Sequence, residues 1–278
     1  MNNDKIVELK KIATDIRIGA VEAVYHAKSG HPGGALSAAD MLACLYFSEL
    51  RINPKYPDNP ERDRFVLSKG HSCPGLYSAM ALRGYFDREE LKRFRHLGSI
   101  TQGHPDMKSI KGIDMSAGSL GQGFSCACGM ALAGKIDKKD YRVYTMIGDG
   151  ESQEGQVWEA IMFASHYKLD NLCLMIDNNG LQIDGKVSDV MNTMPYESKL
   201  EAFGWHVVTI DGNNISQILS AFEEAKATKG KPTAIVAKTV KGKGVSFMEN
   251  EAGWHGKAPN DSEYEQAMAE LTEYKTSL

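Results

Sequence analysis

The fold is decided by two stretches of the chain, VYTMIGDGESQEG at residues 143–155 and NLCLMIDNNGLQIDG at residues 171–185. Each stretch begins with an apolar run of strand length and ends in a polar break that contains glycine. Between the two runs, residues 156–169 carry apolar side chains at helical spacing. A strand, a helix and a second strand in this order predict two parallel strands joined by a right-handed crossover. Both breaks then fall at the carboxyl ends of the strands, where ligands bind in sheets of this kind.

The same alternation of strands and helices extends to both sides of these stretches. Further strands are expected at residues 64–68, 206–210 and 233–239. Helices are expected over residues 4–28, from about residue 37, and over residues 196–203, 215–229 and 262–274. The sequence therefore predicts an α/β fold, a mainly parallel sheet with helices on both faces. We expect residues 1–278 to form a single domain that begins with a helical segment.

Composition narrows the class of protein. The chain has 278 residues, of which 42% are hydrophobic and 24% charged, and its formal net charge is −4 at pH 7. With this charge, and with no basic stripe that carries interleaved aromatic residues, we expect no nucleic-acid partner. No apolar run approaches the roughly 20 residues that cross a bilayer, and the opening residues MNNDKIVELKK lack the apolar core of a secretory signal. We therefore expect no membrane partner either.

The five cysteines indicate a reducing compartment. Their number is odd, and no CxxC pair occurs. Cys126 and Cys128 fall in an apolar run rich in glycine and alanine, so we expect buried free thiols rather than disulfides. These features predict a cytoplasmic location.

Polar side chains at the two strand ends predict a metal site. Asp149 directly follows the first strand and Asn179 follows the second, so both should lie at one edge of the sheet. A hard cation such as Mg²⁺ is often held by one or two carboxylates together with other oxygens and substrate phosphates. Gly148 and Gly150 lack a Cβ, which lets the backbone approach a diphosphate, and a helix that starts near residues 152–154 would direct amide groups at it. GDG alone is more often a plain turn, but its pairing with the second strand end favours the metal site.

Seven fragments resemble those of the transketolase family, in the same order and across nearly the whole chain. They are SGHPGG (29–34), LSKGHSCPGLYS (67–78), TQGHPD (101–106), AGSLGQGFSCACGMALA (117–133), IGDGESQEG (147–155), DNNGLQIDG (177–185) and GWHGKAP (253–259). GDG followed by NN is also similar to the thiamine diphosphate fingerprint. The resemblance implies a thiamine diphosphate-binding fold with this chain as its diphosphate-binding domain. It covers only the N-terminal half of a full transketolase, so the chain resembles the N-terminal subunit of a split enzyme.

The resemblance also implies which residues hold the cofactor. Asp149, Asn179 and the main-chain oxygen of Leu181 would bind Mg²⁺. Residues 118–120 would lie on the aminopyrimidine side of the cofactor and Ile183 on its rings, and the family commonly has proline at the second of these three positions. The residues implied to contact thiamine diphosphate are His71, Gly118, Ser119, Leu120, Asp149, Gly150, Glu154, Asn179, Ile183 and His255.

Four histidines beside glycines supply candidate acid–base groups. His31 and His104 each stand between a glycine and a proline, and His71 and His255 each have one glycine neighbour. An imidazole with a pKa near 6.5 donates or accepts a proton near neutrality. One such turn alone is usually a surface feature, but four of them beside a metal constellation favour a catalytic site. By the resemblance, His31 and His255 would face the hydroxyls and reacting carbonyl of a sugar. His71 would lie by the diphosphate and the reaction centre, and His104 would hold the hydroxyl end of the donor.

Three further features have two interpretations each. Glu154 is either a first-turn carboxylate favoured by the helix dipole or, by the resemblance, part of an interface hydrogen-bond network near the cofactor. Lys238, Lys241 and Lys243 could face a phosphate, but we expect a solvated exit from the last strand. Cys73 closely follows one of the four histidines, and an inert buried thiol is favoured there over a redox role.

The resemblance implies a transferase that moves a two-carbon ketol unit from a ketose phosphate to an aldose phosphate, as in the pentose phosphate pathway. In that family a glutamate against the aminopyrimidine ring and the arginines for the substrate phosphate come from another domain, and we expect no second α/β unit in this chain. The implied partner is a C-terminal-half subunit, with two copies of each chain. The alternatives are a subunit of another thiamine diphosphate enzyme (a deoxyxylulose-phosphate synthase or a 2-oxo-acid dehydrogenase), a transketolase for a specialised sugar, and a non-catalytic homologue.

Overall fold

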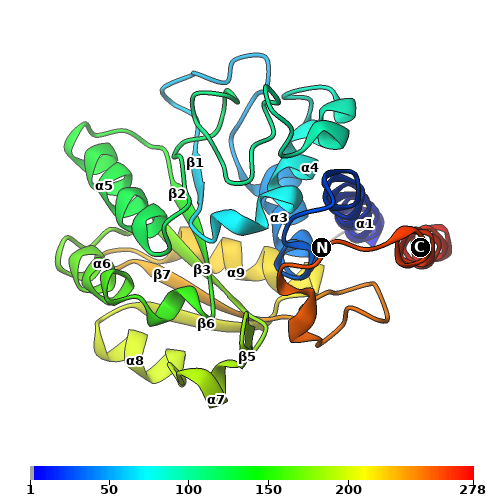
Figure 1. Ribbon diagram of the computed structural model, residues 1–278. Coiled ribbons are helices and arrows are strands. Elements are labelled where there is room, and N and C mark those ends of the chain that lie inside the picture. Colours follow the sequence, from blue (N-terminus) through cyan, green and yellow to red (C-terminus); the bar gives the residue numbers. More distant parts are fainter. Residues whose placement is uncertain (1–2) are drawn as a thin grey trace.

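The computed structural model describes residues 3–278, and its centre is a parallel sheet (Figure 1). Within these residues the sheet has five strands in the order β1-β2-β3-β7-β6, and all neighbours are parallel. The strands are β1 (Arg64–Leu67), β2 (Val143–Gly148), β3 (Leu172–Asn178), β6 (His206–Asp211) and β7 (Thr233–Lys238). A small antiparallel hairpin of β4 (Leu181–Gln182) and β5 (Gly185–Lys186) follows β3.

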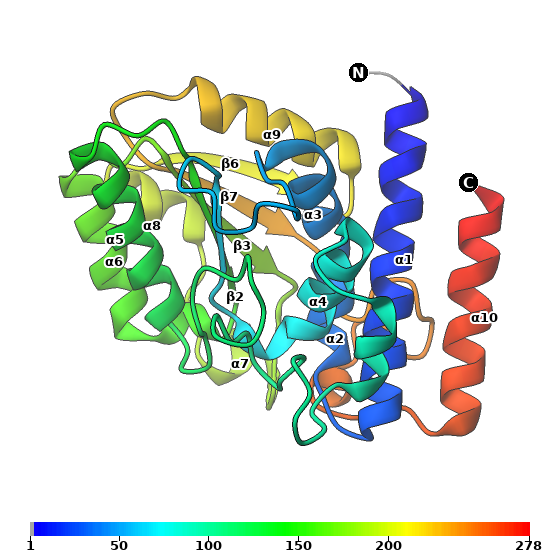
Figure 2. The same ribbon diagram turned by 90° about the horizontal axis from the view of Figure 1, so that it is seen from above.

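Helices cover both faces of the sheet, as the alternation of strands and helices predicts (Figure 2). One face is covered by α1 (Asn3–Ala27), α3 (Ala39–Cys44), α4 (Cys73–Arg83) and α9 (Ile215–Ala227). The other is covered by α5 (Gln122–Ile136), α6 (Gly155–His166) and α8 (Tyr196–Ala202). Alternate residues of each central strand join the two apolar clusters, which explains why these strands are apolar at nearly every position. The predicted α/β fold is confirmed.

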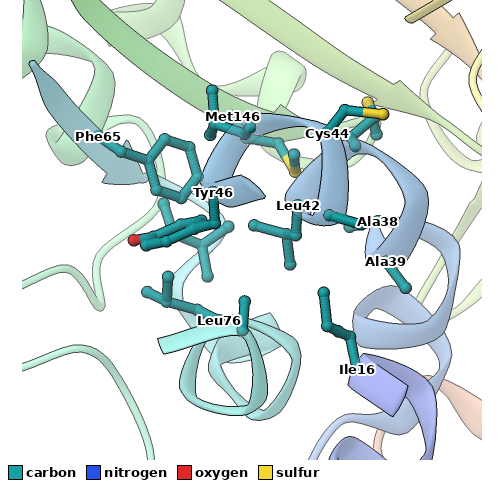
Figure 3. Packing of buried hydrophobic residues seen from close by; sticks show 14 of the residues in the cluster. Ile16, Ala38, Ala39, Leu42, Cys44, Tyr46, Phe65, Leu76 and Met146 are labelled. Atoms are coloured by element: carbon teal, nitrogen blue, oxygen red, sulfur yellow. The ribbon is translucent and has the colours of Figure 1, made fainter. Parts of the chain in front are cut away.

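The first face carries the larger apolar cluster, shown in Figure 3. Ile16 of α1, Leu42 of α3, Leu76 of α4 and Met146 of β2 belong to this cluster, and all four side chains are buried. Beyond this cluster α10 (Asp261–Ser277) lies alongside α1 (Figure 2). This packing holds the long first helix against the sheet and thereby positions the turn that follows it.

The remaining elements are short and lie mostly around the carboxyl edge of the sheet. They are α2 (Pro32–Ser37), a π turn (Leu45–Glu49), α7 (Val187–Val190) and the 3₁₀ turns Gly70–Ser72, Arg88–Arg93, Glu151–Gln153 and Ala252–His255. In the register of the sheet, Gly148 of β2 is paired with Asp177 of β3. The two polar breaks that follow these strands therefore begin side by side.

The structure differs from the sequence-based expectation in three helices. The helix expected from about residue 37 is α3, which begins at Ala39, but the short helix α2 before it was not predicted; it starts at Pro32, and proline is favoured in the first turn of a helix. The helix expected to start near residues 152–154 begins at Gly155, after a 3₁₀ turn. The helix α5 was not predicted, since its glycine- and alanine-rich sequence has no polar face to reveal a period.

The cysteines are all unpaired, as expected. Cys44, Cys73, Cys128 and Cys173 are buried, but Cys126 is half-buried, so the prediction of burial is wrong for that one thiol. It lies on the outer side of α5, where the apolar run of sequence is not covered by the rest of the chain. Separately, among residues 3–278 no helix is both long and apolar enough to span a membrane.

Candidate active site

A cleft with a volume of about 480 Å³ opens at the carboxyl edge of the sheet. This volume lies within the range of small-molecule and cofactor sites. Every residue predicted for the site lines the cleft except Ser119: His31, His71, His104, Gly118, Leu120, Asp149, Gly150, Glu154, Asn179, Leu181, Ile183 and His255. The structure thus brings together side chains from across almost the entire chain.

Asp149 and Asn179 lie side by side in this cleft. Asp149 is 2% exposed, and its Oδ2 accepts a hydrogen bond of 2.6 Å from the backbone amide of Gly180. Its Oδ1 accepts from the Tyr196 hydroxyl at 3.2 Å. Asn179 Oδ1 accepts from the backbone amide of Leu181 at 3.1 Å. The loop after β3 is therefore tied directly to the carboxylate at the end of β2.

The oxygens at this point fit a hard cation. Burial, followed by the nearby charge of Asp177, raises the pKa of Asp149 to about 7, so the carboxylate lies where a bound cation would stabilise its charged form. The Asn179 amide and the Leu181 carbonyl add neutral oxygen donors of the kind that Mg²⁺ accepts. Among residues 3–278 there is no cluster of three or more histidine, cysteine or acidic side chains that could hold a metal. The candidate donor set is therefore one carboxylate combined with amide and carbonyl oxygens.

Asp177, which the sequence analysis did not identify, fixes the side chain of Asn179. It is 0% exposed and accepts hydrogen bonds from Ser37 Oγ, Lys69 Nζ, Thr239 Oγ1 and Asn179 Nδ2. Burial alone would favour the protonated acid, but the Lys69 ammonium and these hydrogen bonds hold the pKa of Asp177 below its ordinary value. Because Asp177 accepts from the amide nitrogen of Asn179, the side-chain amide is fixed in one orientation, with its oxygen towards the Leu181 backbone amide.

Glu151 is a second buried acid that the sequence analysis missed. It is 2% exposed and accepts from the backbone amides of Gly121 at 2.9 Å and Gly148 at 3.2 Å, and from Ser68 Oγ. Burial raises its pKa. These bonds hold the start of α5 and the loop after β1 against the end of β2, and so shape the floor of the cleft.

The second glycine of the GDG break lies close to the β4–β5 hairpin. A Cβ at Gly150 would lie 3.2 Å from Cβ of Gln182, so a side chain there would require Gln182 to shift by a few tenths of an ångström. Gln182 is in turn hydrogen-bonded to Gln153. Glu154 is exposed, lines the cleft and has no capping hydrogen bond from its side chain, so the dipole and interface interpretations both stay predictions.

Three of the glycine-flanked histidines form a cluster over the cleft. The ring centres of His31 and His71 are 5.2 Å apart, those of His31 and His255 are 5.5 Å apart, and those of His71 and His255 are 5.1 Å apart. They come from the start of α2 and from two 3₁₀ turns that are distant in sequence. His104 lines the same cleft beside Gly118, where a Cβ would lie 3.8 Å from the imidazole.

All four imidazoles are held in the neutral form at pH 7. Burial, with the Arg95 charge second, lowers the pKa of His31 to about 4. Burial and then Lys241 lower the pKa of His255 to about 3. Burial is also the largest cause that lowers the pKa of His71 and of His104. A neutral imidazole carries one donor and one acceptor nitrogen, so each ring can give one hydrogen bond and take another.

Lys241 is buried, and the expectation of a solvated lysine is wrong at this position. It is 2% exposed, with its Nζ 2.9 Å from His255 Nδ1 and 3.4 Å from the Leu181 carbonyl oxygen. Burial, and then the Lys69 charge, lower the pKa of Lys241 to about 8. Lys238 is exposed, as expected. The cleft thus holds two buried ammonium groups at one end, an arrangement suited to a diphosphate.

Comparison with known proteins agrees with this geometry. Residues 8–274 match the family model described as the thiamine diphosphate-binding domain of transketolase. The chain belongs to the transketolase family. It therefore contains a thiamine diphosphate-binding domain, and its fold is that of transketolases.

Three relatives define how much of a transketolase the chain spans. It is 47% identical over 269 residues to the 6-deoxy-6-sulfo-D-fructose transketolase subunit SqwG of Clostridium sp. (strain MSTE9), covering 97% of this chain and 98% of that one. It is 43% identical to an apulose-4-phosphate transketolase subunit of Phocaeicola vulgatus, covering 91% of this chain and 90% of that one. The crystal structure of transketolase from Campylobacter jejuni superposes with a TM-score of 0.91 at 36% identity, over 98% of this chain but only 43% of that one.

Proposed function

We propose that this chain is the N-terminal, thiamine diphosphate-binding subunit of a split transketolase. The observation that carries the proposal is the coverage of its relatives: the chain spans 98% and 90% of two proteins named as transketolase subunits but 43% of a transketolase from Campylobacter jejuni. In the proposed reaction a two-carbon ketol unit passes from a ketose phosphate to an aldose phosphate. Residues 1–278 would form a single diphosphate-binding domain that begins with a helical segment.

In this proposal the cofactor is held at the ends of β2 and β3. Asp149, Asn179 and the Leu181 carbonyl would bind Mg²⁺, and the Mg²⁺ would fix the diphosphate. The two ammonium groups of Lys69 and Lys241 would neutralise the remaining phosphate charge. Thiamine diphosphate supplies, when bound, a nucleophilic carbon that carries the two-carbon unit between sugars.

The histidines would act on the sugar. Three neutral imidazoles within about 5–6 Å of one another offer donors and acceptors to the hydroxyl and carbonyl oxygens of a substrate in the same cleft. His31 and His255 would hold or move protons at the reacting oxygens, His71 would lie next to the diphosphate, and His104 would bind the hydroxyl end of the donor. None of these roles requires a charged imidazole before the reaction begins.

A partner chain would complete the cleft. Ile183 lines the cleft and is nevertheless 64% exposed, and Val190, Met191 and Met194 nearby are also large exposed apolar residues. Apolar side chains gathered at the rim of a site favour an interface. We propose a C-terminal-half transketolase chain as the partner, two copies of each, in the cytoplasm. The five unpaired cysteines support a reducing compartment.

A specialised ketose is the second candidate donor. The two relatives matched over nearly their full length are named for 6-deoxy-6-sulfo-D-fructose and apulose 4-phosphate, not for the general reaction. This observation favours a donor whose distal group differs from that of a common ketose phosphate. The chemistry at the two reacting carbons would be the same.

Reconstitution tests the proposal. This chain and the C-terminal-half chain encoded in the same genome are purified separately, and turnover is measured with thiamine diphosphate and Mg²⁺ for each chain and for the mixture. The mixture should be active and each chain alone inactive. Turnover by this chain alone, after contamination is ruled out, would contradict the split-enzyme proposal.

The same assay decides between donors. Fructose 6-phosphate, 6-deoxy-6-sulfo-D-fructose and apulose 4-phosphate are compared with one aldose phosphate acceptor by their kcat/KM values. A specialised enzyme should prefer one of the last two by more than about tenfold, the effect of roughly one hydrogen bond or ion pair. Equal values for all three would remove the case for a specialised donor.

A further inference from the structure

Arg95 joins the two Gly-His-Pro turns of the cleft. On one side its guanidinium donates to Ser29 Oγ through Nη1 and lies 3.3 Å from His31 Nδ1 through Nη2. On the other side it packs on Gly103, where a Cβ would lie 3.0 Å from Arg95 Nε. One guanidinium is therefore held between the residues that precede His31 and His104.

The contact with His31 determines where the imidazole carries its proton. An arginine has five N–H donors, has no acceptor and is not deprotonated in proteins. A ring nitrogen bonded to it must therefore accept, which leaves Nδ1 of His31 without a proton. Since the pKa of His31 is lowered to about 4 by burial and by Arg95, the ring is neutral at pH 7 and its single proton is on Nε2.

The protonated nitrogen lies on the side of the ring away from Arg95. His31 lines the cleft, and a Cβ at Gly256, next to His255, would lie 3.7 Å from His31 Nε2 and 3.6 Å from its Cδ2. Arg95 itself does not line the cleft, since it approaches the ring from the opposite nitrogen. The Nε2 edge of His31 is thus turned towards the segment that carries His255 and away from Arg95.

We propose that Arg95 is a positioning residue that fixes His31 in the Nε2–H tautomer, so that His31 faces the cleft as a hydrogen-bond donor. The part of this inference that concerns catalysis rests on the proposed function: a donor at this place would bind a substrate oxygen and stabilise negative charge that develops on it. In the resting enzyme His31 would not serve as a proton acceptor through Nε2, because that nitrogen already carries the proton.

Nitrogen NMR of the full chain measures the tautomer without any reaction. Histidine is labelled with ¹⁵N, and the His31 signals are assigned as those that disappear in His31→Gln. At pH 7.5 the wild type should show a protonated Nε2 and an unprotonated Nδ1 for His31. A protonated Nδ1 in the wild type would overturn the proposal, and that result requires no variant of Arg95.

Variants of Arg95 then test the cause. Arg95→Met removes all donors and should shift His31 to Nδ1–H or to a mixture, whereas Arg95→Lys retains a cationic donor and should preserve Nε2–H. Arg93→Met, which removes an exposed arginine paired with Glu90, should leave the His31 signals unchanged. If His31 stays entirely Nε2–H in folded Arg95→Met, then Arg95 does not set the tautomer and the proposal fails.

Measurements of kcat on the reconstituted enzyme distinguish a failure of the Arg95 proposal from a failure of the proposed function. With the partner present, Arg95→Met should lower kcat about tenfold, the effect of roughly one hydrogen bond, and Arg95→Lys should recover most of it. In a His31→Gln background Arg95→Met should have no further effect on kcat, since its action passes through the imidazole; an equal loss in both backgrounds would contradict the positioning role. An inactive wild-type mixture would contradict the proposed function but leave the NMR result standing.

Discussion

At the scale of single residues, Lys241 connects the histidine cluster to the Leu181 carbonyl, one of the proposed cation ligands. Its ammonium is 2.9 Å from His255 Nδ1 and 3.4 Å from the Leu181 carbonyl oxygen. A positive charge in contact with an imidazole disfavours protonation of that imidazole. Lys241 therefore does two things at once: it helps to keep His255 neutral, and it places a cation where a diphosphate would lie.

Replacing Lys241 by methionine should raise the pKa of His255 above its present value of about 3, because the opposing charge is removed. Burial is the larger cause of the low value, so the pKa should stay below 6.5. An NMR titration of His255 in the isolated chain measures this. Lys238→Met, at an exposed lysine of the same segment, is the matched control and should not move the His255 titration. An identical His255 pKa in wild type and Lys241→Met would show that the ammonium does not act on the ring.

The lowered histidine pKa values also predict how stability depends on pH. Between pH 6.5 and about 4 the unfolded chain protonates His31 while the folded chain does not, so unfolding takes up protons and stability falls as the pH falls. In His31→Gln this loss between pH 7 and pH 5 should be smaller by about 1 kcal/mol, after allowance for solvent screening. The raised pKa of Asp149 has the opposite effect, because the folded chain takes up a proton there first and stability rises as the pH falls. This contribution is present in both the wild type and His31→Gln, so it cancels in the comparison.

Denaturant unfolding of wild type and His31→Gln without cofactor or metal measures the difference. The comparison is repeated at pH 8, where His31 is neutral in both the folded and the unfolded chain. The difference between the two proteins should therefore change between pH 7 and pH 5 but not between pH 8 and pH 7. A constant difference from pH 8 to pH 5 would show that His31 titrates alike in both states.

Sequence motifs identified only some of the polar groups of the cleft, and they missed buried charged groups such as Lys69 and Glu151. Asp149, Asn179 and the glycine-flanked histidines follow strand ends or turns whose signals are local. Lys69 and Asp177, by contrast, form a buried pair only because a loop and a strand far apart in sequence meet. Lys241 was expected to be solvated but is buried. Its burial results from packing between segments distant in sequence, which a local pattern does not predict.

At the scale of elements, the start of α5 depends on a close contact with the loop after β1. A Cβ at Gly123 would lie 2.8 Å from the Ser68 Cα, whereas a Cβ at Gly129 would have no atom within 4 Å. Both glycines are in the same helix. Replacing each glycine by alanine therefore compares two effects: the higher helix propensity of alanine, which applies at both positions, and the steric cost of the methyl group, which applies only at Gly123.

Gly123→Ala should destabilise the isolated chain by about 1–3 kcal/mol, because backbone must move to accept the methyl group. Gly129→Ala should instead stabilise it by about 0.5–1 kcal/mol, since alanine is the better helix former and nothing is displaced. Thermal or denaturant unfolding measures both. Equal shifts of the same sign would mean that the approach of α5 to Ser68 does not constrain the helix.

The strands and most helices could be predicted from their periods, but α5 could not. A helix is recognised in a sequence by the contrast between an apolar and a polar face. The segment from Gln122 to Gly134 has no charged residue, so it offers no such contrast. Its outer side is partly exposed in this chain, and an uncharged exposed helix face is what a subunit interface would cover.

At the scale of the whole molecule, the parallel sheet brings all the groups of the cleft to one edge. The alternation of strands and helices predicts that edge, since every parallel strand ends there. It does not predict the order of strands: β7 lies between β3 and β6, so the segment after β7, which carries Lys241 and His255, comes to lie beside the loop after β3. The position of this last segment brings Lys241 and His255 next to the Leu181 carbonyl, one of the proposed cation ligands.

We expect the oxygens at the ends of β2 and β3 to hold a divalent cation, and this cation to hold thiamine diphosphate. Calorimetric titration of the reconstituted complex with thiamine diphosphate, at increasing Mg²⁺ and after chelation, tests it most directly. We predict one cofactor per copy of this chain, binding that requires the cation, and an affinity loss of more than about 100-fold in Asp149→Ala. Equally tight binding in Asp149→Ala, or binding that persists unchanged without any divalent cation, would show that these oxygens do not hold the cofactor through a cation.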